Sequence, residues 1–354
     1  MARKLKVGVV GCGQIAQIAH LPYLQELPQF EIGALCDLSR EVAEALGRKY
    51  GVSHLYTDFD LMVRQPDLDA VLVTNKNHAA PAMAAMEAGK HVLVEKPIAF
   101  NLKQADAMIA SAKRNRVLLM VAYMKRYDPA FEMAQQLVAQ MDDIHLIHVH
   151  DFAGTYQINQ DIYELEIATD LSPEAIGKLR EQDNADILAD IGPDRPDLLE
   201  AHDIMIHLAI HDINALHGLY GLPGKIISAQ LFRNNFVTAL FEYENGVRLT
   251  WETGNLTSLL DWDEEMKVWG KEQRVAIKFP FPYLKNAATK LIVEENDRGS
   301  AVKREIIASY DEAFKREWRH FYDCAVNDRQ PLTNAVEARE DLAFAVHLMK
   351  SAID

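Results

Sequence analysis

The sequence predicts an α/β chain that begins with a doubly wound parallel sheet and continues as an α+β domain with an open, mainly antiparallel sheet. Three observations support this prediction. Short, Val-rich apolar runs alternate with helical segments up to about Tyr123. A hairpin signal, Glu244-Asn-Gly246, and other polar turns separate strand-like segments after Lys225. The length of 354 residues favours two domains, which we place at 1–123 and 124–354.

The first domain is expected to hold strands wherever a brief apolar run is rich in β-branched residues. These runs are Lys4–Gly11, Phe30–Cys36, Asp69–Thr74, His91–Glu95 and Val117–Tyr123. Helices are expected between them, at Ala16–Leu21, Ser39–Lys49, Ala79–Gly89 and Asn101–Asn115. Ser39 is a suitable N-cap, Gly89 is a suitable helix end, and Pro22 predicts a break or a kink after the first helix.

The second domain is expected to combine helices with an antiparallel sheet. Helices are predicted at Pro129–Met141, His202–Leu219, Glu312–Val326 and Val336–Ala352. Strands are predicted at Ile144–Phe152, Ile226–Phe232, Val237–Tyr243, Val247–Glu252, Glu265–Trp269 and Leu291–Glu294. An insertion at about 154–201 is polar, acidic and too long for an ordinary connection. We expect it to contain a short helix, Pro173–Gln182, and either to cover a site or to decorate an oligomer.

The composition argues against several classes of function. The formal net charge of −15, from 37 basic and 52 acidic residues, repels the phosphates of nucleic acids and of anionic membranes. Three cysteines cannot form a disulfide framework, and no segment resembles a secretory signal or a membrane span. We therefore expect a cytoplasmic protein with a small-molecule substrate and with neither a nucleic-acid nor a membrane partner.

A glycine motif follows the first predicted strand and opens a helix. In Gly11-x-Gly13-x-x-Ala16 the first glycine permits a tight turn, the second lets the backbone approach a pyrophosphate, and the small third residue lets the helix pack close to the strand. Asp37 ends the next strand, where its carboxylate would bind a ribose diol and repel a 2′-phosphate. Arg40 would instead accept that phosphate, lie in solvent or pack on the adenine. The expected cofactor is NAD, bound by Gly11, Gly13, Gln14, Ile15, Ala16 and Asp37.

Glu95-Lys96-Pro97 directly follows another predicted strand. A lysine at the carboxyl end of a parallel strand points into the ligand crevice, and Glu95 beside it would keep the ammonium charged and positioned. Taken alone, Lys96 is more simply a surface lysine in a loop. Pro97 is a candidate for a cis peptide bond.

Taken in order, these motifs resemble those of the Gfo/Idh/MocA oxidoreductases, the family of glucose-fructose oxidoreductase and inositol dehydrogenase. The likeness rests on Gly11-x-Gly13-x-x-Ala16, Asp37, Asn75-x-x-His78, Ala88-Gly-Lys-His-Val-Leu-Val-Glu-Lys-Pro97 and Tyr123-x-x-Arg126-x-x-Pro129. The family implies an N-terminal Rossmann domain that binds NAD(P), and a C-terminal domain whose open sheet often forms an oligomer interface. It also implies hydride transfer at a secondary alcohol of a sugar or cyclitol.

The resemblance assigns roles to matching positions. Lys96 matches the lysine that binds the reacting hydroxyl, and we place Glu95 and Lys96 beside the cofactor. Asn75 and His78 match residues that line the nicotinamide side. Tyr123 matches a residue near the substrate. The family's usual Thr-Pro-Asn reads Val73-Thr74-Asn75 here, which is a departure.

A second departure lies in a helix. The family commonly shows Asp-x-x-x-His-x-x-Asp, whereas this chain shows His207-x-x-x-His211-x-x-Asn214. His211 matches the family histidine, and His207 and Asn214 stand where aspartates are usual. Asp203 lies one turn earlier and is expected on the same helical face as His207 and His211, where it is a candidate replacement for the missing carboxylate.

Four histidines allow other interpretations. His207 and His211 match a metal-ligand spacing, but a His-Glu-x-x-His motif is absent from the sequence, so we expect no metal. His148 and His150 share one face of a strand and would face either a cleft or solvent.

The candidate residues suit hydride transfer. A neutral imidazole can take the hydroxyl proton, a lysine ammonium stabilises the developing alkoxide, and NAD carries the redox chemistry. We assign His211 as general acid/base and Lys96 as alkoxide binder or proton relay. His207 is a second candidate relay, and both histidines are expected to bind substrate together with Lys96 and Tyr123.

The predicted function is that of an NAD-dependent oxidoreductase acting on a sugar, a sugar derivative or a cyclitol. Three alternatives remain: an NAD-dependent glycosidase that works by transient oxidation, a non-catalytic NAD-binding regulator, and an imine or enone reductase. We also expect a homo-oligomer, either a dimer or a tetramer. An open sheet face that carries Leu249 or Trp251 would prefer to be covered, and the resemblance indicates the same.

Overall fold

The computed structural model describes residues 3–155, 162–256 and 258–352. Its contacts divide the chain into two compact units that interleave along the sequence. The first unit consists of Met1–Ala122, Gln160–Pro193 and Glu317–Glu340, and the second of Tyr123–Asn159, Asp194–Arg316 and Asp341–Asp354. Residues 156–161 of the expected insertion lie outside the described residues.

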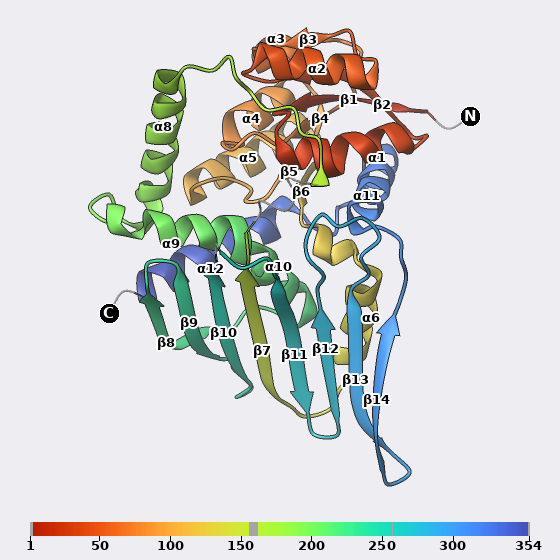
Figure 1. Cartoon of the computed structure of the whole chain (residues 1–354), viewed down its shortest axis with the longest axis vertical. Coiled ribbons are helices and arrows are strands. Elements are labelled where there is room, and N and C mark those ends of the chain that lie inside the picture. The colour runs from red at the N-terminus through yellow and green to blue at the C-terminus, as the bar shows by residue number, and fades with distance from the viewer. Residues whose placement is uncertain (1–2, 156–161, 257, 353–354) are drawn as a thin grey trace. The chain divides into compact units, whose positions relative to one another are not determined.

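The first unit is built on a six-stranded parallel sheet with the strand order β3-β2-β1-β4-β5-β6 (Figure 1). Its strands are β1 Leu5–Val10, β2 Phe30–Cys36, β3 Leu55–Tyr56, β4 Ala70–Val73, β5 His91–Glu95 and β6 Leu119–Ala122. The order reverses between β1 and β4, which is the ligand-binding switch point of such sheets. The predicted doubly wound sheet is confirmed. The two residues of β3 were missed because so short an edge strand carries no hydrophobic pattern.

Helices connect these strands. They are η1 Ala16–His20, α1 Leu21–Glu26, α2 Arg40–Tyr50, α3 Phe59–Val63, α4 Ala79–Glu87 and α5 Leu102–Asn115. Side-chain oxygens cap three of them. Ser39 accepts the Val42 amide, as the sequence predicts, while Asp58 accepts the Asp60 amide and Asn101 accepts the Gln104 amide. The left-handed backbone of Gly89 follows α4.

The helix does not stop at Pro22, where the sequence predicts a break or a kink. The helix continues past Pro22 to Glu26, and the π-helical segment η1 precedes the proline. A proline within a helix removes one N–H donor and crowds the preceding turn. The wider π-helical turn is a common way of accommodating such a disruption, so the chain does not need to stop.

The insertion contributes one long helix, α8 Pro173–Ile191, to the first unit. Ser172 caps its N-terminus by accepting the Ala175 amide, and the helix ends at Gly192, whose φ is 127°. The prediction of a short helix ending at Gln182 was therefore wrong. No glycine or proline lies between Gln182 and Gly192, so nothing in the local chemistry stops the helix earlier.

The second unit is built on an eight-stranded sheet with the order β14-β13-β12-β11-β7-β10-β9-β8 (Figure 1). Its strands are β7 Ile144–Ala153, β8 Lys225–Phe232, β9 Phe236–Glu242, β10 Arg248–Asn255, β11 Asp263–Gly270, β12 Gln273–Lys278, β13 Lys290–Asp297 and β14 Ser300–Ile307. All neighbouring strands are antiparallel except β7 and β10, so the expected open and mainly antiparallel sheet is confirmed. The prediction missed β12 and the largely exposed edge strand β14, which reads as charged and polar rather than apolar.

The helical segments of the second unit are η2 Met124–Tyr127, α6 Pro129–Val138, η3 Pro196–Leu198, α9 Leu199–Ile204, η4 Met205–Ala209 and α10 Ile210–Leu219. Two more helices, α11 Ala313–Asn327 and α12 Ala335–Ser351, each contribute to both units. Helices cover one face of the sheet: Leu208 of η4 packs on Trp262 and Ala153, and Phe344 of α12 packs on Phe241. No helix among the described residues is long and apolar enough to cross a bilayer.

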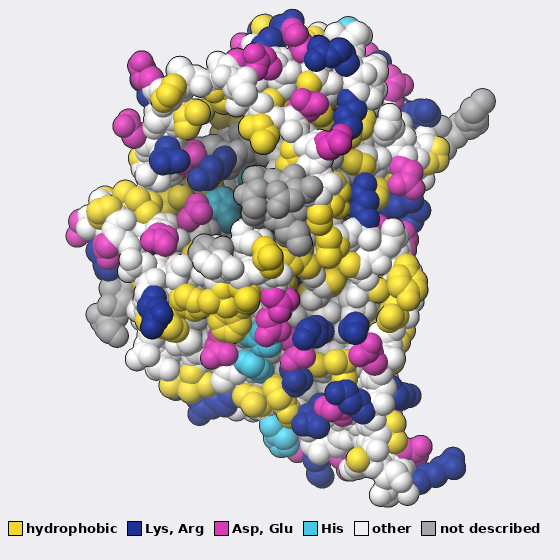
Figure 2. Space-filling view, in the orientation of Figure 1, with side chains coloured by type: hydrophobic (Ala, Val, Ile, Leu, Met, Phe, Trp, Pro, Cys, Tyr) yellow, Lys and Arg dark blue, Asp and Glu magenta, His cyan; other side chains and the backbone are white. Residues whose placement is uncertain are grey.

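The other face of this sheet does not carry Leu249 or Trp251, and that expectation was wrong. Both side chains are fully buried on the helical side. A two-residue period shows that Leu249 and Trp251 share a face, but it does not show which face is covered. The opposite face displays His148 and His150, with ring centroids 5.3 Å apart, and histidine side chains gather over these strands in Figure 2.

Candidate functional site

A cavity of about 680 Å³ opens at the carboxyl ends of β1, β2 and β4 in the first unit. This is the edge of a doubly wound sheet at which ligands bind. The residues that line it include Gly11, Gly13, Asp37 and Asn75. The structure therefore brings these four predicted cofactor residues to one pocket, of a size that suits a large organic ligand.

The two glycines of the turn differ in what they permit. Gly11 has a φ of +86°, and a Cβ there would lie 2.3 Å from the backbone nitrogen of Asn75, so no other residue fits. Gly13 is exposed, and a Cβ at Gly13 would meet no other described residue within 4 Å. Ala16 is fully buried. The open side of Gly13 is where a pyrophosphate can approach the backbone, so the turn fits a dinucleotide.

Asp37 connects the end of β2 to the glycine turn. Its Oδ2 accepts the Cys12 amide at 2.7 Å, and its Oδ1 accepts the Ser39 amide at 2.8 Å. Each carboxylate oxygen can accept more than one hydrogen bond, so both remain able to accept from a ribose diol. Arg40, the alternative partner for a phosphate, donates its Nε to Glu44 of the same helix at 2.7 Å.

The insertion supplies one wall of this cavity. Leu171, Leu179, Gln182 and Asp186 all line it. Hydrogen bonds hold the segment to the sheet domain: Asn77 donates to Asp186 at 2.9 Å, and the amide of Leu102 donates to Asp190 at 2.6 Å. The part of the insertion that the structure describes therefore lines this cavity.

The insertion is also anchored beside the glycine turn. The side-chain amide of Gln17 donates to the carbonyl of Glu166 at 2.9 Å and accepts the Glu166 amide at 2.8 Å. Gln17 itself is largely buried, and it also donates to the Cys12 carbonyl at 2.8 Å. These paired bonds fix the position of the insertion relative to the turn.

The loops after β4 and β5 meet through His78. Its Nδ1 lies 2.6 Å from the carbonyl oxygen of Pro97. A carbonyl only accepts, so Nδ1 carries the proton. The Lys96–Pro97 peptide bond is cis. His78 thus holds the backbone next to Lys96. At the same edge of the sheet, the side-chain amide of Asn75 donates to the Asn77 carbonyl at 2.6 Å.

Glu95 is buried, and its side chain turns towards the core. Its Oε1 lies 2.9 Å from Nε2 of His20, and its Oε2 accepts the backbone amide of Lys96 at 3.0 Å. Burial alone would raise the pKa of Glu95, but the His20 hydrogen bond and the nearby charges of Lys96 and His78 hold this pKa below its ordinary value. Glu95 is therefore an anion next to Lys96, as the sequence interpretation required.

Trp318 of α11 settles the tautomer of His20. The indole Nε1 can only donate, and it lies 3.1 Å from Nδ1 of His20. In the neutral ring, Nδ1 is therefore the acceptor, and Nε2 carries the proton that points to Glu95. Sequence reasoning missed both His20 and Trp318, since neither residue belongs to a recognisable motif.

In the second unit, the structure pairs His207 with Asp203. Nδ1 of His207 lies 3.2 Å from a carboxylate oxygen of Asp203 and 3.0 Å from its backbone carbonyl. Both of these oxygens accept, so Nδ1 carries the proton. Asp203 therefore orients His207, which stands at the position of the family aspartate. The π-helical segment η4 contains His207 and ends before His211, so the simple helical spacing assumed from the sequence does not apply there.

Tyr123 and His211 meet in the same unit. Their ring centroids lie 6.3 Å apart in an edge-to-face arrangement. Tyr123 is almost fully buried, whereas His211 is half-buried. The structure thus brings together the predicted base and the residue predicted to lie near the substrate. Lys96 belongs to the first unit.

Asn214, the second departure from the family pattern, has a structural partner. Its amide donates to Oδ2 of Asp341 at 2.7 Å, and its backbone carbonyl accepts Nη1 of Arg126 at 3.3 Å. The other oxygen of Asp341 lies 2.8 Å from Nδ1 of His217. Asn214 therefore fastens α10 to α12 in the second unit.

A buried charge cluster near this helix escaped the sequence analysis. Lys125 of η2 donates to Asp212 at 3.0 Å and also to Glu264. Glu264 accepts the Trp262 indole N–H at 2.8 Å. Oxygens of Asp151, Asp212 and Glu264 all lie within 4.8 Å of one another, and the Lys125 ammonium supplies a cation beside them. The only local signal was a lysine inside the Tyr123-x-x-Arg126 motif.

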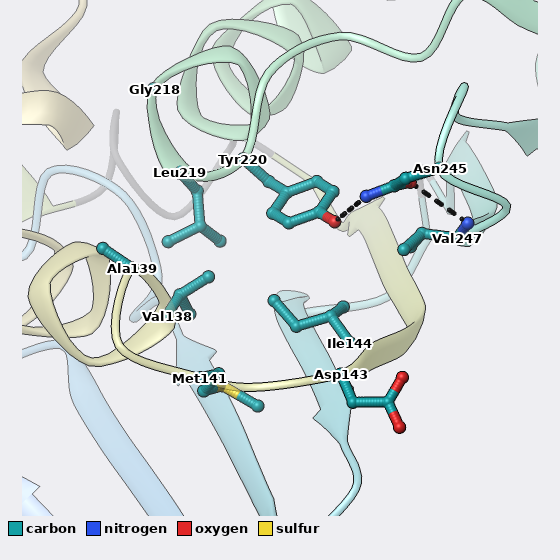
Figure 3. A pocket seen from close by; sticks show the side chains of 10 residues that line it. All are labelled: Val138, Ala139, Met141, Asp143, Ile144, Gly218, Leu219, Tyr220, Asn245 and Val247. Atoms are coloured by element: carbon teal, nitrogen blue, oxygen red, sulfur yellow. Dashed lines mark hydrogen bonds between the residues drawn. The ribbon is translucent and has the colours of Figure 1, made fainter.

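A second cavity, of about 540 Å³, lies in the second unit and is shown in Figure 3. It is bordered by the end of α6, the end of α10 and the β9–β10 turn. Tyr220 accepts a hydrogen bond from the Asn245 amide at 2.9 Å on one side of it. None of the predicted site residues is among the described residues that line it, and we do not assign it to the reaction.

Comparisons with known proteins show which families and structures this chain is similar to. Residues 5–123 match the model of an oxidoreductase family, Gfo/Idh/MocA, described as having an NAD-binding Rossmann fold. The chain is 31% identical over 136 residues to the myo-inositol 2-dehydrogenase of Thermotoga maritima, which covers 38% of this chain and 40% of that protein. The alignments span only 40–47% of the length of this and two other curated relatives.

Solved structures share the whole fold. An aldose-aldose oxidoreductase from Caulobacter crescentus, complexed with glycerol, superposes with a TM-score of 0.75 at 20% identity, covering 99% of this chain and 98% of that one. A 3-ketoreductase from Actinomadura kijaniata, in complex with NADP and TDP-benzene, gives 0.74 at 18% identity, covering 97% and 96%.

The fold and the glycine-turn cavity define a dinucleotide-binding α/β protein. The resemblance seen in the sequence is confirmed, since residues 5–123 match the model of the Gfo/Idh/MocA oxidoreductase family. The family's NAD-binding fold agrees with the predicted nicotinamide dinucleotide cofactor.

Proposed function

We propose that the protein is an NAD-dependent oxidoreductase that transfers hydride between NAD and a secondary alcohol of a sugar, a sugar derivative or a cyclitol. The observation that carries this proposal is the cavity lined by Gly11, Gly13 and Asp37 at the switch point of the sheet. The name of the Thermotoga relative, a myo-inositol 2-dehydrogenase, supports the substrate class.

We assign the cofactor to residues 1–123, and substrate binding and oligomerisation to residues 124–354. NAD, when bound, supplies the hydride acceptor. The pyrophosphate would lie at the Gly13 amide side of the turn, and Asp37 would accept hydrogen bonds from the ribose. Gln14 and Ile15 open the helix that follows the turn, and their backbone amides would contribute to binding the same anion.

The chemical step is assigned to Lys96, His211 and His207. The Lys96 ammonium would stabilise the alkoxide that develops as hydride leaves, and His211 would take the hydroxyl proton. His207 would relay that proton, because the contact with Asp203 orients its ring. Tyr123 would contact the substrate beside His211.

The test is a dehydrogenase screen of sugars, inositols and sugar acids with NAD, followed by NADH absorbance. We expect turnover with at least one of these alcohols and tighter binding of NAD than of NADP, because Asp37 would repel a 2′-phosphate. A glycoside cleaved without net NADH would favour the glycosidase. NAD binding with no turnover of any alcohol would favour the regulator.

A further inference from the structure

The N-terminus of α2 begins directly after the proposed ribose-binding residue. Asp37 directly follows β2, Ser39 is the N-cap, and Arg40 and Glu41 begin the first turn. Such a terminus presents unpaired N–H groups and a positive partial charge, which together attract anions. A 2′-phosphate on the cofactor ribose would lie next to Asp37 and would meet this terminus.

This terminus already holds an anion that belongs to the chain itself. The amide of Glu41 donates to Oδ2 of Asp170 at 3.3 Å, and the Ser39 hydroxyl and the Arg40 amide also hydrogen-bond to the Asp170 carboxylate. The neighbouring Thr169 donates its hydroxyl to the Glu41 carboxylate. The Ser39 hydrogen bond, with those from the backbone amides, lowers the pKa of Asp170, so the group is a carboxylate at neutral pH.

Asp170 is close to the cofactor cavity in the fold as well as in the chain. Leu171 follows it directly and lines the cavity beside Asp37 and Leu38. The remaining cation at this terminus, Arg40, is paired with Glu44. Thus carboxylates already accept hydrogen bonds from the donors that would bind a 2′-phosphate beside Asp37. The main carboxylate, that of Asp170, comes from the insertion.

We propose that Asp170 is a specificity-determining residue that excludes the 2′-phosphate of NADP by occupying the N-terminus of α2. This inference rests on the proposed NAD-dependent function and adds a second determinant to Asp37. The insertion then does more than cover the cavity, since it supplies a negative charge at the place where an NADP-binding protein would use a phosphate-binding group. At least one relative of this chain is named as an NADP⁺-dependent scyllo-inositol 2-dehydrogenase, so cofactor choice differs among similar proteins.

The experiment measures the dissociation constants of NAD⁺ and NADP⁺ by isothermal titration calorimetry for the full chain and for Asp170→Asn. Asparagine retains an oxygen that can accept the Glu41 amide, so the cap is preserved while the charge is lost. We expect the ratio of NADP⁺ to NAD⁺ affinity to rise about 2- to 5-fold, the size of one exposed charge at a helix terminus. Asp170→Ser, a second neutral capping residue, should give the same direction.

Asp190→Asn is the matched control. Asp190 lies in the same insertion and accepts the first amide of another helix, α5, through the Leu102 contact. If the insertion merely has to be anchored, both variants should change the ratio equally; if Asp170 acts through its charge near Asp37, only the Asp170 variants should change it. Thermal melts show whether each variant folds.

The outcomes separate this inference from the proposed function. Wild-type protein that binds neither NAD⁺ nor NADP⁺ would overturn the proposed function. Wild-type protein that prefers NAD⁺, together with Asp170 variants of unchanged preference or an equal change in Asp190→Asn, would overturn the role of Asp170 alone.

Discussion

Nε2 of His20 lies 2.9 Å from Oε1 of Glu95, the residue that precedes Lys96. His20 in turn accepts the indole N–H of Trp318. Two residues near opposite ends of the chain, His20 and Trp318, thus position the Glu95 carboxylate, which in turn accepts the backbone amide of Lys96. This chain of hydrogen bonds lies wholly within the first unit and holds the proposed electrophile from the core side.

A second buried carboxyl group lies beside this network. Glu317 is fully buried, and burial, together with the charge of Glu95, raises its pKa well above the ordinary value. Between the unfolded pKa, about 4.3, and the raised folded pKa, the folded protein holds the extra proton. This group therefore lowers stability as pH rises through that window, by up to about 1.4 kcal/mol per pH unit.

Glu317→Gln should remove this dependence of the unfolding free energy on pH. The difference in unfolding free energy, variant minus wild type, should grow as pH rises from 4 to 7, measured by urea denaturation at each pH. Glu87→Gln, an exposed change on α4, serves as the control and should give a nearly flat difference. A flat difference for Glu317→Gln as well would mean that Glu317 is ionised in the fold.

Lys125→Met should strongly destabilise the second unit. It would leave the buried carboxylates of Asp212 and Glu264 without their cation, and breaking such a pair typically costs about 3–5 kcal/mol. Lys225→Met removes an exposed partner of Glu242 and should cost about 1 kcal/mol or less. Equal melting temperatures for the two variants would contradict the importance of the buried cluster.

Lys96→Met should abolish most turnover while leaving NAD affinity nearly intact. The ammonium acts on charge that develops in the transition state, and loss of one such donor costs about 10²–10³-fold in kcat. His211→Ala should cost roughly 10²–10⁴-fold through lost proton transfer. Steady-state kinetics on one identified alcohol, with NAD titration alongside, provides the measurement. Near-normal kcat in both variants would remove these residues from the reaction.

His207→Ala should also lower kcat, by about 10²-fold if the ring relays a proton. Because Asp203 contacts His207 directly, Asp203→Asn should cost less, and the double variant should be no slower than His207→Ala alone. Multiplicative losses would instead mean that Asp203 acts independently of His207.

The protein should form a homo-oligomer through the open face of the second sheet. Leu146 lies on this face opposite Trp269, in the same row as His148 and His150. Leu146→Glu should therefore lower the mass measured by light scattering at micromolar concentration, whereas Ile176→Glu on exposed α8 should not. A monomer mass for the wild type would refute the prediction.

Much of the secondary structure of the first unit could be predicted from the sequence, because it depends on local chemistry. The Val-rich runs, the Ser39 and Asn101 caps and the glycine turn depend on neighbouring residues, so β2 and β5 begin and end where the sequence predicts. The Glu244-Asn-Gly246 hairpin was predicted for the same reason, and Gly246 has the required positive φ. These features need no knowledge of distant parts of the chain.

Only the tertiary structure decided which distant groups meet. Asp170 lies 129 positions from Glu41, and Trp318 lies 298 positions from His20. Neither contact leaves a periodic or spacing signal, because a side-chain hydrogen bond depends on where packing places both partners and not on the residues between them. The orientation of Trp251 follows the same logic: alternation along β10 specifies two faces, and the helices packed on the sheet decide which of them is buried.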